Sequence, residues 1–501
     1  MLLRRSLAAA VVVCLLLAGT GIGLTTAAPA PSTVRVSYLQ RILSLDPHGS
    51  AGAERMSWII GRHLYNQLVS WDYSAKRFQP QLALRWRNID PTTWEFELRR
   101  GVKFHDGQGF TSAAVKTSLE RVVAMKGPLA PLFAPVQSIE TPDPYRVVIK
   151  TREPVGTLLS NLTILAIVPA GTPATPDFGD RPVGTGPFKF VEFVRDARLV
   201  LDANPSYWQQ GIPRSQRVIF VDIPEVAARA TAVETGEIDI AVGLPPEQMK
   251  RLRTTPNVTV EVGLTTLTRA LWINAERAPF SDVRVRHALQ HAINVNAITS
   301  SLVAGIATPS TSPIASNVVC YAKMPPISYD TALARKLLAE AGFPRGFETS
   351  VKWTVGNPKE REVSDAIVGQ LALVGIRVHN LQQPRAIWLD DLLKLNWDFE
   401  ISTTGGGTGD PDFTLRRLYH TRSKRTGWSN QEFELVDDAA ASVNLQQRCA
   451  MYKRAQEILW DQGPAVFLFD PLESYAFRTS VQGFKAPPSE IFGVADVAVS
   501  P

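Results

Sequence analysis

Strand-like and helix-like hydrophobic patterns alternate along almost the whole chain, and this alternation limits its possible folds more than any other feature. Residues 94–98 alternate apolar and charged side chains, which is the period of a half-buried strand. The apolar run 218–223 is followed by the helical stretch 225–235, and a strand that leads into a helix is typical of α/β construction. We therefore expect an α/β fold.

Two of the predicted helices have well-marked limits. One begins at Asp282, and from Val285 onward its apolar residues fall at i, i+3, i+4 and i+7 and form one stripe that must pack on a core. The other has Asp330 as N-cap and ends at Gly342. Further helices are predicted over 360–374, 433–442 and 445–460, and further strands over 145–149, 376–378 and 466–469.

Length and composition allow a large folded protein. The chain has 501 residues, which is enough for two or three domains of about 150 residues each. Hydrophobic residues make up 45% and charged residues 20%, as in ordinary globular proteins. The net charge of +6 comes from interspersed basic and acidic residues and not from a basic tract, so we expect no nucleic-acid partner.

The N-terminus has the pattern of a secretory signal. Arg4 and Arg5 precede an apolar run over 7–17, and the small residues of 27–30 offer a cleavage site. We therefore predict that residues 1–30 are a cleaved signal peptide and that the mature protein is soluble and periplasmic. An uncleaved anchor is the competing interpretation, because the run stays free of charge over about 18 residues, the length at which a membrane span becomes possible.

The chain has three cysteines, which are too few for a disulfide-built scaffold. Cys14 lies inside the apolar run and not in the context of a lipid-carrying cysteine, so we expect no lipid anchor. Cys320 and Cys449 remain after cleavage of the signal. In an oxidising compartment these two could pair, but two free thiols agree equally well with the sequence.

No residue pattern predicts an enzyme, a metal site or a cofactor. The Asp-Gly pair after His105 indicates a tight turn, so we assign His105 a structural role. The stretch 184–187 lacks the lysine ending of a phosphate loop, and no nucleophile motif is present. His287 and His291 lie four residues apart on a helix without the glutamate of a zinc-protease motif, which favours a solvated helix face.

Short motifs follow one another in a characteristic order along the mature chain. They are Leu45–His48, Gly101–Gly107, Gly184–Phe188, Asn204–Trp208, Gly236–Asp239, Pro279–Arg284 and Ala339–Phe343. Each is weak alone, but in this order they resemble the large periplasmic solute-binding proteins of ABC importers. This is family 5 of the bacterial extracellular solute-binding proteins, which includes dipeptide-, oligopeptide- and nickel-binding members.

The resemblance implies a two-lobed periplasmic-binding-protein fold of the α/β class, with a hinge between the lobes. Lobe I would comprise residues 31–270, with an extra subdomain inserted at about 52–170. Lobe II would comprise residues 271–474, and residues 475–501 would return to lobe I.

The resemblance also implies a function. Such a protein captures a peptide or another small polar solute between its lobes and delivers it to an ABC permease with its ATPases, because the closed form is what the permease recognises. We expect a monomer that needs no cofactor. A nickel or metal-chelate ligand within the same family is the alternative, and a secreted metal-dependent hydrolase that uses His287 and His291 is the hypothesis from another class.

One segment departs from the peptide-binding pattern. In peptide-binding relatives, residues just before an Asp-Pro-Asp turn give the cleft a Trp and an Asp, and that carboxylate pairs with the amino terminus of the ligand. Here the turn begins at Asp410, but the Trp position falls on Thr404 and the Asp position on Gly407. The run Thr404, Gly405, Gly406 and Gly407 should instead offer room and backbone N–H groups, which suit oxygen-rich or anionic ligands. A flexible glycine loop outside the pocket is the alternative.

The remaining ligand-binding candidates come from segments that line the cleft in the family. They are Tyr38, His48, Trp272, Asn274, Trp388 and Trp397. Aromatic side chains at these places would stack on a ligand, but Trp272 and Trp397 are equally suited to the core.

Overall fold

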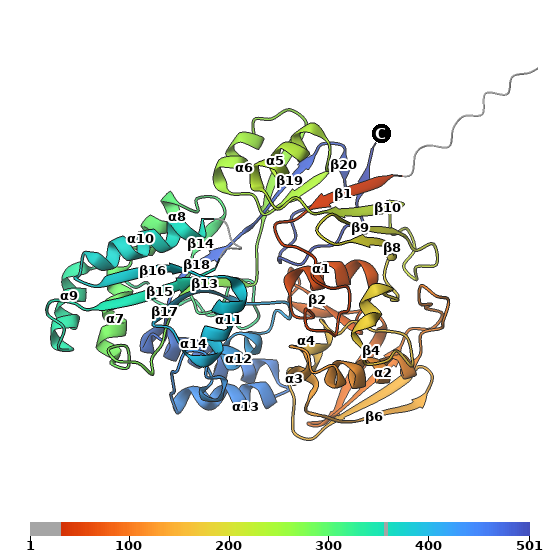
Figure 1. The fold of residues 1–501 in the computed structure, drawn as a ribbon. Helices are drawn as coiled ribbons and strands as arrows, with labels where there is room; N and C mark the ends of the chain where they lie inside the picture. Colours follow the sequence, from red (N-terminus) through yellow and green to blue (C-terminus); the bar gives the residue numbers. More distant parts are fainter. Residues whose placement is uncertain (1–31, 355–358, 501) are drawn as a thin grey trace, which may run out of the picture. The chain divides into compact units, whose positions relative to one another are not determined.

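The structure is a computed structural model that describes residues 32–354 and 359–500. The signal peptide predicted over residues 1–30 lies outside the described residues. Within the described part, helices and strands alternate as expected (Figure 1). Most strands belong to two large mixed sheets and one smaller antiparallel sheet. The α/β class is therefore confirmed. Among these residues, no helix combines the length and the apolar character needed to cross a membrane.

The first large sheet has the strand order β12-β19-β11-β1-β10-β9-β8. Its strands are β1 (Thr33–Ser37), β8 (Phe188–Val194), β9 (Arg198–Ala203), β10 (Arg217–Val221), β11 (Ile240–Val242), β12 (Val258–Gly263) and β19 (Glu473–Arg478). The central strand β1 runs parallel to both β10 and β11. The carboxyl ends of these three strands therefore lie at one edge of the sheet, which is where ligands bind in open α/β sheets.

The second large sheet has the order β14-β18-β13-β17-β15-β16. Its strands are β13 (Leu267–Ile273), β14 (Ala307–Pro309), β15 (Glu348–Trp353), β16 (Arg377–Gln382), β17 (Phe399–Gly405) and β18 (Ala465–Pro471). Strand β15 is parallel to β16 and β17, so these three strands also end at a common edge. Every residue of β13 is buried, as befits a strand covered on both faces.

The smaller sheet has the order β4-β5-β7-β6. It consists of β4 (Ala83–Asp90), β5 (Thr93–Leu98), β6 (Val136–Asp143) and β7 (Arg146–Thr151), while β2 (Val69–Asp72) pairs with β3 (Arg77–Pro80) and β20 (Val481–Gln482) with β21 (Ala498–Val499). Apolar side chains of β5 and β7 share one core with helix α2 (Ser112–Ala124). This sheet lies within the stretch predicted to hold an inserted subdomain.

The helices agree with the sequence pattern where a local cap defines them. The bounds are α1 Arg55–Leu64, α3 Ala130–Phe133, α4 Leu158–Leu162, α5 Val226–Thr235, α6 Pro246–Leu252, α7 Val283–Ala292, α8 Val295–Ser301, α9 Thr331–Glu340, α10 Glu360–Ala372, α11 Arg385–Lys394, α12 Leu415–Tyr419, α13 Leu435–Ala441 and α14 Leu445–Gln462. Asp330 caps α9 by accepting two backbone N–H groups, as predicted. Asp282, where the other helix is predicted to begin, caps α7 by accepting the Arg284 N–H. The helix predicted over 433–442 is shorter, because a 3-10 turn at Glu432–Glu434 precedes α13.

The chain passes between the two large sheets twice. Strand β12 ends at Gly263 and β13 begins at Leu267, so residues 264–266 make the first passage. Strand β18 ends at Pro471 and β19 begins at Glu473, so Leu472 makes the second. The lobe limits given in the sequence analysis stay predictions, but these two passages show where the chain crosses.

Candidate functional site

A cavity of about 730 Å³ lies beside both passages, and we call it the interlobe cavity. From the side of the first sheet, Tyr38, Arg55 and Glu473 line it. From the side of the second sheet, Arg269 and Glu360 line it together with Thr403 near the carboxyl end of β17. Both sets of residues belong to strand ends or to elements next to them, which is the usual place of a ligand site in such sheets.

The first wall is a hydrogen-bonded network of Tyr38, Arg55 and Glu473. The Tyr38 hydroxyl donates to Glu473 Oε2 at 2.9 Å and accepts from Arg55 Nη1 at 2.7 Å. The Arg55 guanidinium lies 3.4 Å from the same carboxylate oxygen. Burial raises the pKa of Glu473, and the positive charge of Arg55 opposes that shift. The network thus keeps a charged pair at the wall of the cavity.

The second wall carries another charged pair. Arg269 of β13 forms an ion pair with Glu360 at the start of α10, and its guanidinium also donates to the Thr403 hydroxyl. Arg269 is 6% and Glu360 6% exposed, so neither charge is well solvated. Apolar side chains cover much of the remaining wall: Leu39, Leu244, Leu267, Val303, Ile306, Val363 and Phe469. Two cations and two anions in an apolar setting suit a solute that itself carries both charges.

Among the predicted ligand-binding residues, Tyr38 lies at the interlobe cavity. The glycine run does not have the open space that we expected, because Trp58 of α1 packs against it. A Cβ on Gly407 would lie 3.0 Å from two atoms of the Trp58 indole, and one on Gly406 would lie 2.8 Å from the Phe413 ring. A Cβ on Gly405 would meet the Thr266 carbonyl oxygen. That these glycines contact the solute stays a prediction.

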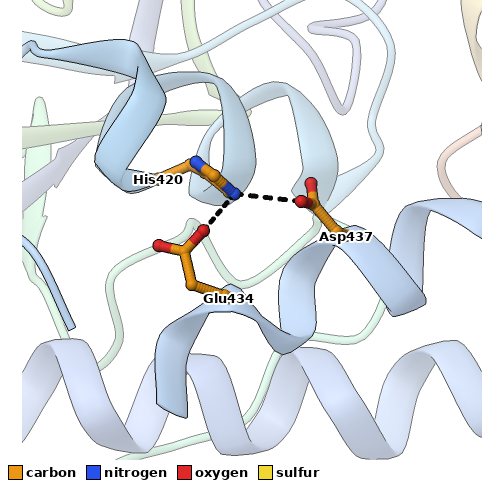
Figure 2. Close-up of side chains that lie close together, drawn as sticks. All are labelled: His420, Glu434 and Asp437. Carbon is orange, nitrogen blue, oxygen red and sulfur yellow. Dashed lines mark hydrogen bonds and ion pairs between the residues drawn. The ribbon is translucent and has the colours of Figure 1, made fainter. Parts of the chain in front are cut away.

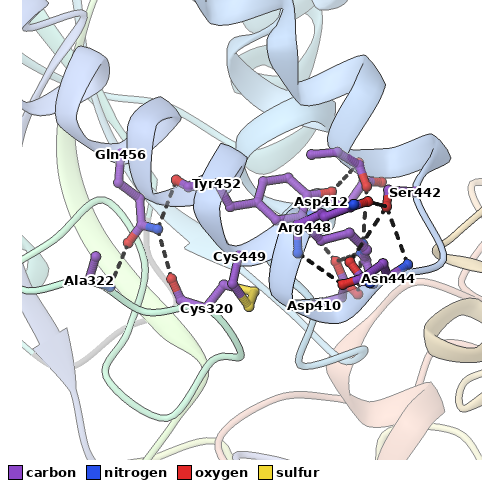
Figure 3. The surroundings of a disulfide bond; sticks show 12 residues. Cys320, Ala322, Asp410, Asp412, Ser442, Asn444, Arg448, Cys449, Tyr452 and Gln456 are labelled. Carbon is purple, nitrogen blue, oxygen red and sulfur yellow. Dashed lines mark hydrogen bonds and ion pairs between the residues drawn. A yellow bond between two sulfur atoms is a disulfide. The ribbon is translucent and has the colours of Figure 1, made fainter.

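Thr404 and Asp410 are buried and already bonded. The Thr404 hydroxyl donates to the Thr268 carbonyl at 3.2 Å. Asp410 accepts from Arg448 with both carboxylate oxygens, at 2.9 and 2.8 Å, and from the Ser160 hydroxyl at 2.7 Å (Figure 3). Asp410 therefore joins the inserted stretch to α14 through its carboxylate. Its predicted role in ligand binding remains untested.

His48 and Asn274 are held by backbone carbonyls and do not line the interlobe cavity. His48 Nε2 bonds to Ala166 O at 2.9 Å, and burial lowers the pKa of His48 to about 4, so the ring is neutral. Asn274 donates to the carbonyls of Leu395 and Trp397 at 3.1 and 2.8 Å. These contacts hold both side chains in place, and that His48 and Asn274 contact the solute stays a prediction.

The three predicted tryptophans belong to one hydrophobic core in the second half of the chain. Trp272 donates its indole N–H to the Tyr419 hydroxyl at 3.0 Å. Trp388 and Trp397 are 5% and 1% exposed, and neither lines the interlobe cavity. Core packing is the alternative interpretation for Trp272 and Trp397, and that the three tryptophans contact the solute stays a prediction.

The two cysteines that the sequence left open form a disulfide. Cys320 and Cys449 are 129 residues apart, and their bond joins the loop before α9 to helix α14 (Figure 3). Gln456, two turns further along α14, holds the same loop by donating to Cys320 O at 2.9 Å and accepting from the Ala322 N–H at 3.0 Å. The disulfide and Gln456 together fix this loop on α14.

His420, Glu434 and Asp437 are close enough to hold a metal ion (Figure 2). However, the backbone N–H of Arg422 donates to His420 Nδ1 at 3.0 Å, which makes Nδ1 the acceptor and leaves the proton on Nε2. That Nε2–H points at both carboxylates. Asp437 also pairs with the guanidinium groups of Arg416 and Arg422. The cluster is thus satisfied as a network of hydrogen bonds and ion pairs.

The histidine pair of the hydrolase hypothesis does not form a common site in the structure. His287 Nε2 contacts the carbonyl oxygen of Asp461, and His291 Nδ1 bonds to the carbonyl oxygen of Ser328 at 2.8 Å. Each ring is tied to a different segment of the chain. The pair therefore holds helix α7 in place, which is more than the solvated face that we predicted.

Four charged residues of the interlobe cavity, Arg55, Arg269, Glu360 and Glu473, were not among the predicted site residues. Arg269 had a usable signal, because it is a single charged residue within an apolar strand pattern and such a residue needs a buried partner. Glu473 had a weaker one, since it lies next to the predicted limit of lobe II at residue 474. Arg55 and Glu360 begin helices α1 and α10, where charged residues are common, and nothing in the sequence distinguishes them.

Comparisons with known proteins agree with this geometry. The model of the family described as "Bacterial extracellular solute-binding proteins, family 5 Middle" matches residues 77–426. The glutathione-binding protein GsiB of Pectobacterium atrosepticum is 28% identical over 471 residues, covering 90% of this chain and 91% of that protein. GsiB of Escherichia coli K12 is 27% identical over 485 residues and covers 93% and 94%.

Solved structures show the same fold. The periplasmic binding protein DppA of Helicobacter pylori, in complex with the peptide STSA, superposes with a TM-score of 0.82 at 25% identity, over 93% of this chain and 98% of that one. A dipeptide-binding protein of Pseudoalteromonas sp. SM9913 in complex with Met-Leu gives a TM-score of 0.82 at 22% identity, over 93% and 100%. The second comparison bears on the fold alone.

Proposed function

The chain belongs to family 5 of the bacterial extracellular solute-binding proteins, and from this premise we propose that its interlobe cavity captures a zwitterionic, peptide-like solute. The protein has the two-lobed fold of the family and is the substrate-binding component of an ABC importer, not an enzyme. The family works with ABC permeases and their ATPases. We further propose that residues 1–30 direct this chain to the periplasm, where it acts as a monomer.

The charge balance of the interlobe cavity carries the proposal. Its wall holds the Arg55–Glu473 pair and the Arg269–Glu360 pair, so the four charges sum to zero before a solute enters. A zwitterion adds one positive and one negative charge, so the charges in the cavity still sum to zero after it binds. A solute with a single charge would leave one group uncompensated, and a neutral sugar would use none of them.

The relatives support a peptide of small size. GsiB is named for glutathione, a tripeptide with one ammonium and two carboxylate groups, and DppA was solved with a tetrapeptide. The cavity of about 730 Å³ lies within the range of pockets that hold small ligands. Glutathione is therefore the first probe, with dipeptides and tetrapeptides beside it.

The mechanism follows from the two passages between the sheets. We propose that residues 264–266 and Leu472 act as the hinge, because the chain links the two sheets there. A solute that contacts Arg55 on one side and Arg269 on the other favours the closed arrangement by the difference in its affinity for the two states. The permease would then recognise the closed arrangement.

The test combines retained ligand with direct titration. Mature protein from the periplasm is analysed by native mass spectrometry before and after denaturation, and ligand-free protein is titrated with glutathione, dipeptides, tetrapeptides, an uncharged sugar and nickel-histidine by calorimetry. We expect a peptide to bind, and we expect Arg269→Met to weaken it by about tenfold or more, as loss of a charged hydrogen bond does. The exposed Arg377→Met, on β16 of the same sheet, is the matched control.

Two outcomes would overturn the proposal. One is binding of the sugar or of nickel-histidine in preference to every peptide. The other is peptide binding that Arg269→Met and Arg377→Met leave equally unchanged, because the solute would then not use the interlobe cavity.

A further inference from the structure

Helix α1 presents three large side chains along one face. Arg55, Trp58 and Arg62 lie at i, i+3 and i+7, which places them in one stripe. Arg55 lines the interlobe cavity, and Trp58 packs on Gly406 and Gly407 of the other lobe. The stripe therefore follows the boundary between the lobes, and Arg62 is its last member.

Arg62 lines a second, smaller cavity of about 330 Å³. The side chains around it include Ser57, Trp58 and Gln67, and no Asp or Glu lines it. Arg62 makes no hydrogen bond or ion pair with any described residue, whereas Arg55 on the same helix pairs with Glu473. Burial lowers the pKa of Arg62, and Tyr73 is the group that opposes the shift. Arg62 is half-buried, so its charge is partly removed from water with no counter-charge beside it.

Three further side chains of this cavity have polar groups without partners, whereas the Thr163 hydroxyl donates to Ser160 O at 2.7 Å. Gln67 and Ser57 are 5% and 8% exposed, and neither side chain forms a hydrogen bond within the described chain. The indole N–H of Trp58 is buried and unpartnered among the same residues. A buried polar group is nearly always hydrogen-bonded, so the Trp58 indole N–H, beside the unpaired side chains of Arg62, Ser57 and Gln67, calls for an acceptor in this space.

We propose that this second cavity is an anion subsite, in which Arg62 binds a carboxylate with help from Ser57, Gln67 and the Trp58 indole N–H. The guanidinium supplies paired N–H donors that match a carboxylate, and the amide, hydroxyl and indole add further donors. The carboxylate comes either from the transported solute, which rests on the proposed function, or from a separate small anion. The four charges of the interlobe cavity already sum to zero, so a second carboxylate on the solute would find no counter-charge there. It would pair with Arg62 in the second cavity.

The first experiment uses acetate as the probe. Mature protein is titrated with sodium acetate at constant ionic strength, with acetamide as the neutral isostere, and the melting temperature is followed. We expect acetate to raise the melting temperature by mass action and acetamide to leave it unchanged. Arg62→Gln should abolish the acetate effect, and Arg62→Lys should keep part of it. Arg77→Gln, an exposed residue of the same region, is the control for loss of one positive charge.

The second experiment measures affinity for glutathione, or for the solute that mass spectrometry identifies. If Arg62→Gln weakens that solute by about tenfold or more and Arg77→Gln does not, the subsite holds the solute's own carboxylate. If Arg62→Gln abolishes the acetate effect but leaves the solute affinity unchanged, the subsite holds a separate anion.

The proposal is overturned if Arg62→Gln changes neither the acetate response nor the solute affinity while circular dichroism shows the same fold. It is also overturned if acetate and acetamide stabilise the wild-type protein equally and the solute binds both proteins alike. Should no solute bind the wild-type protein, the proposed function fails, and the acetate comparison alone decides on the subsite.

Discussion

Removal of the Asp410 carboxylate should destabilise the protein strongly, because it leaves the buried guanidinium of Arg448 without its carboxylate partner. Arg448 and Asp410 have side chains only 7% and 5% exposed, and Arg448 Nη2 lies 2.8 Å from the carboxylate. In Asp410→Ala, Arg448 keeps its hydrogen bond to the Ala439 carbonyl at 3.1 Å, and the Ser160 hydroxyl loses its acceptor. The Asp412 carboxylate also attracts Arg448, but Arg448 would lose both of its direct bonds to a carboxylate.

The magnitude follows from this geometry. Loss of one partner of a buried, hydrogen-bonded ion pair costs about 3 to 5 kcal/mol. Arg448→Ala should cost less than Asp410→Ala, because Asp410 would retain the Ser160 hydroxyl at 2.7 Å and the Asp412 N–H at 3.0 Å. The double variant should lose less than the sum, with a coupling energy of about 1 to 3 kcal/mol.

Urea unfolding followed by tryptophan fluorescence measures these costs, and the exposed pair Lys394–Asp390 is the matched control. Its side chains are 67% and 58% exposed, so Asp390→Ala should cost no more than about 1 kcal/mol. The reasoning is refuted if Asp410→Ala unfolds at the same urea concentration as the wild type. Unchanged stability together with loss of solute affinity would instead make Asp410 a ligand contact.

Three further predictions concern other parts of the molecule. Gly407→Asp should destabilise the protein by about 1 to 3 kcal/mol in the same unfolding assay, because its Cβ would press on Trp58 at 3.0 Å. Adding Trp58→Ala to this variant should restore part of the lost stability. A Gly407→Asp variant as stable as the wild type would contradict this reasoning. Replacement of Cys320 and Cys449 by serine should cost about 2 to 4 kcal/mol relative to the oxidised protein, since the bond closes a loop of 129 residues; equal unfolding midpoints would show that the bond adds nothing. Burial raises the pKa of Glu400 from 4.5 to about 8, so its protonated form stabilises the fold below about pH 4.5 and that contribution is lost as the pH rises through about 8. Glu400→Gln should therefore flatten the pH dependence of stability between these values, and an unchanged profile would count against the shift.

The sequence predicted those parts of the fold that local chemistry determines. Asp282 and Asp330 cap their helices with their own carboxylates, and such caps involve residues two or three positions apart. The resemblance to the family then supplied the two-lobed architecture, which no periodicity could give. The paired cysteines stayed open because a disulfide depends on the approach of two segments 129 residues apart.

The site was harder to predict because its main contacts are between distant residues. The glycine run looked open in sequence, since nothing near it marks Trp58 as the side chain that covers Gly407. Arg55 and Glu473 meet across 418 residues, and Arg269 and Glu360 belong to different elements. Three of the predicted aromatic residues, Trp272, Trp388 and Trp397, share a core, because large apolar side chains serve packing wherever a sheet is covered on both faces.

The position of Glu473 suggests how solute binding reaches the hinge. Glu473 is the first residue of β19 and directly follows Leu472, so the Arg55–Tyr38–Glu473 network joins the wall of the cavity to one of the two crossings. A carboxylate of the solute that takes over Arg55 would withdraw positive charge from Glu473, whose pKa burial already raises. The free energy of the chain at this crossing would then depend on whether a solute occupies the cavity. A ligand shifts the equilibrium between two arrangements of the lobes only if it interacts differently with them, and this network would supply such a difference.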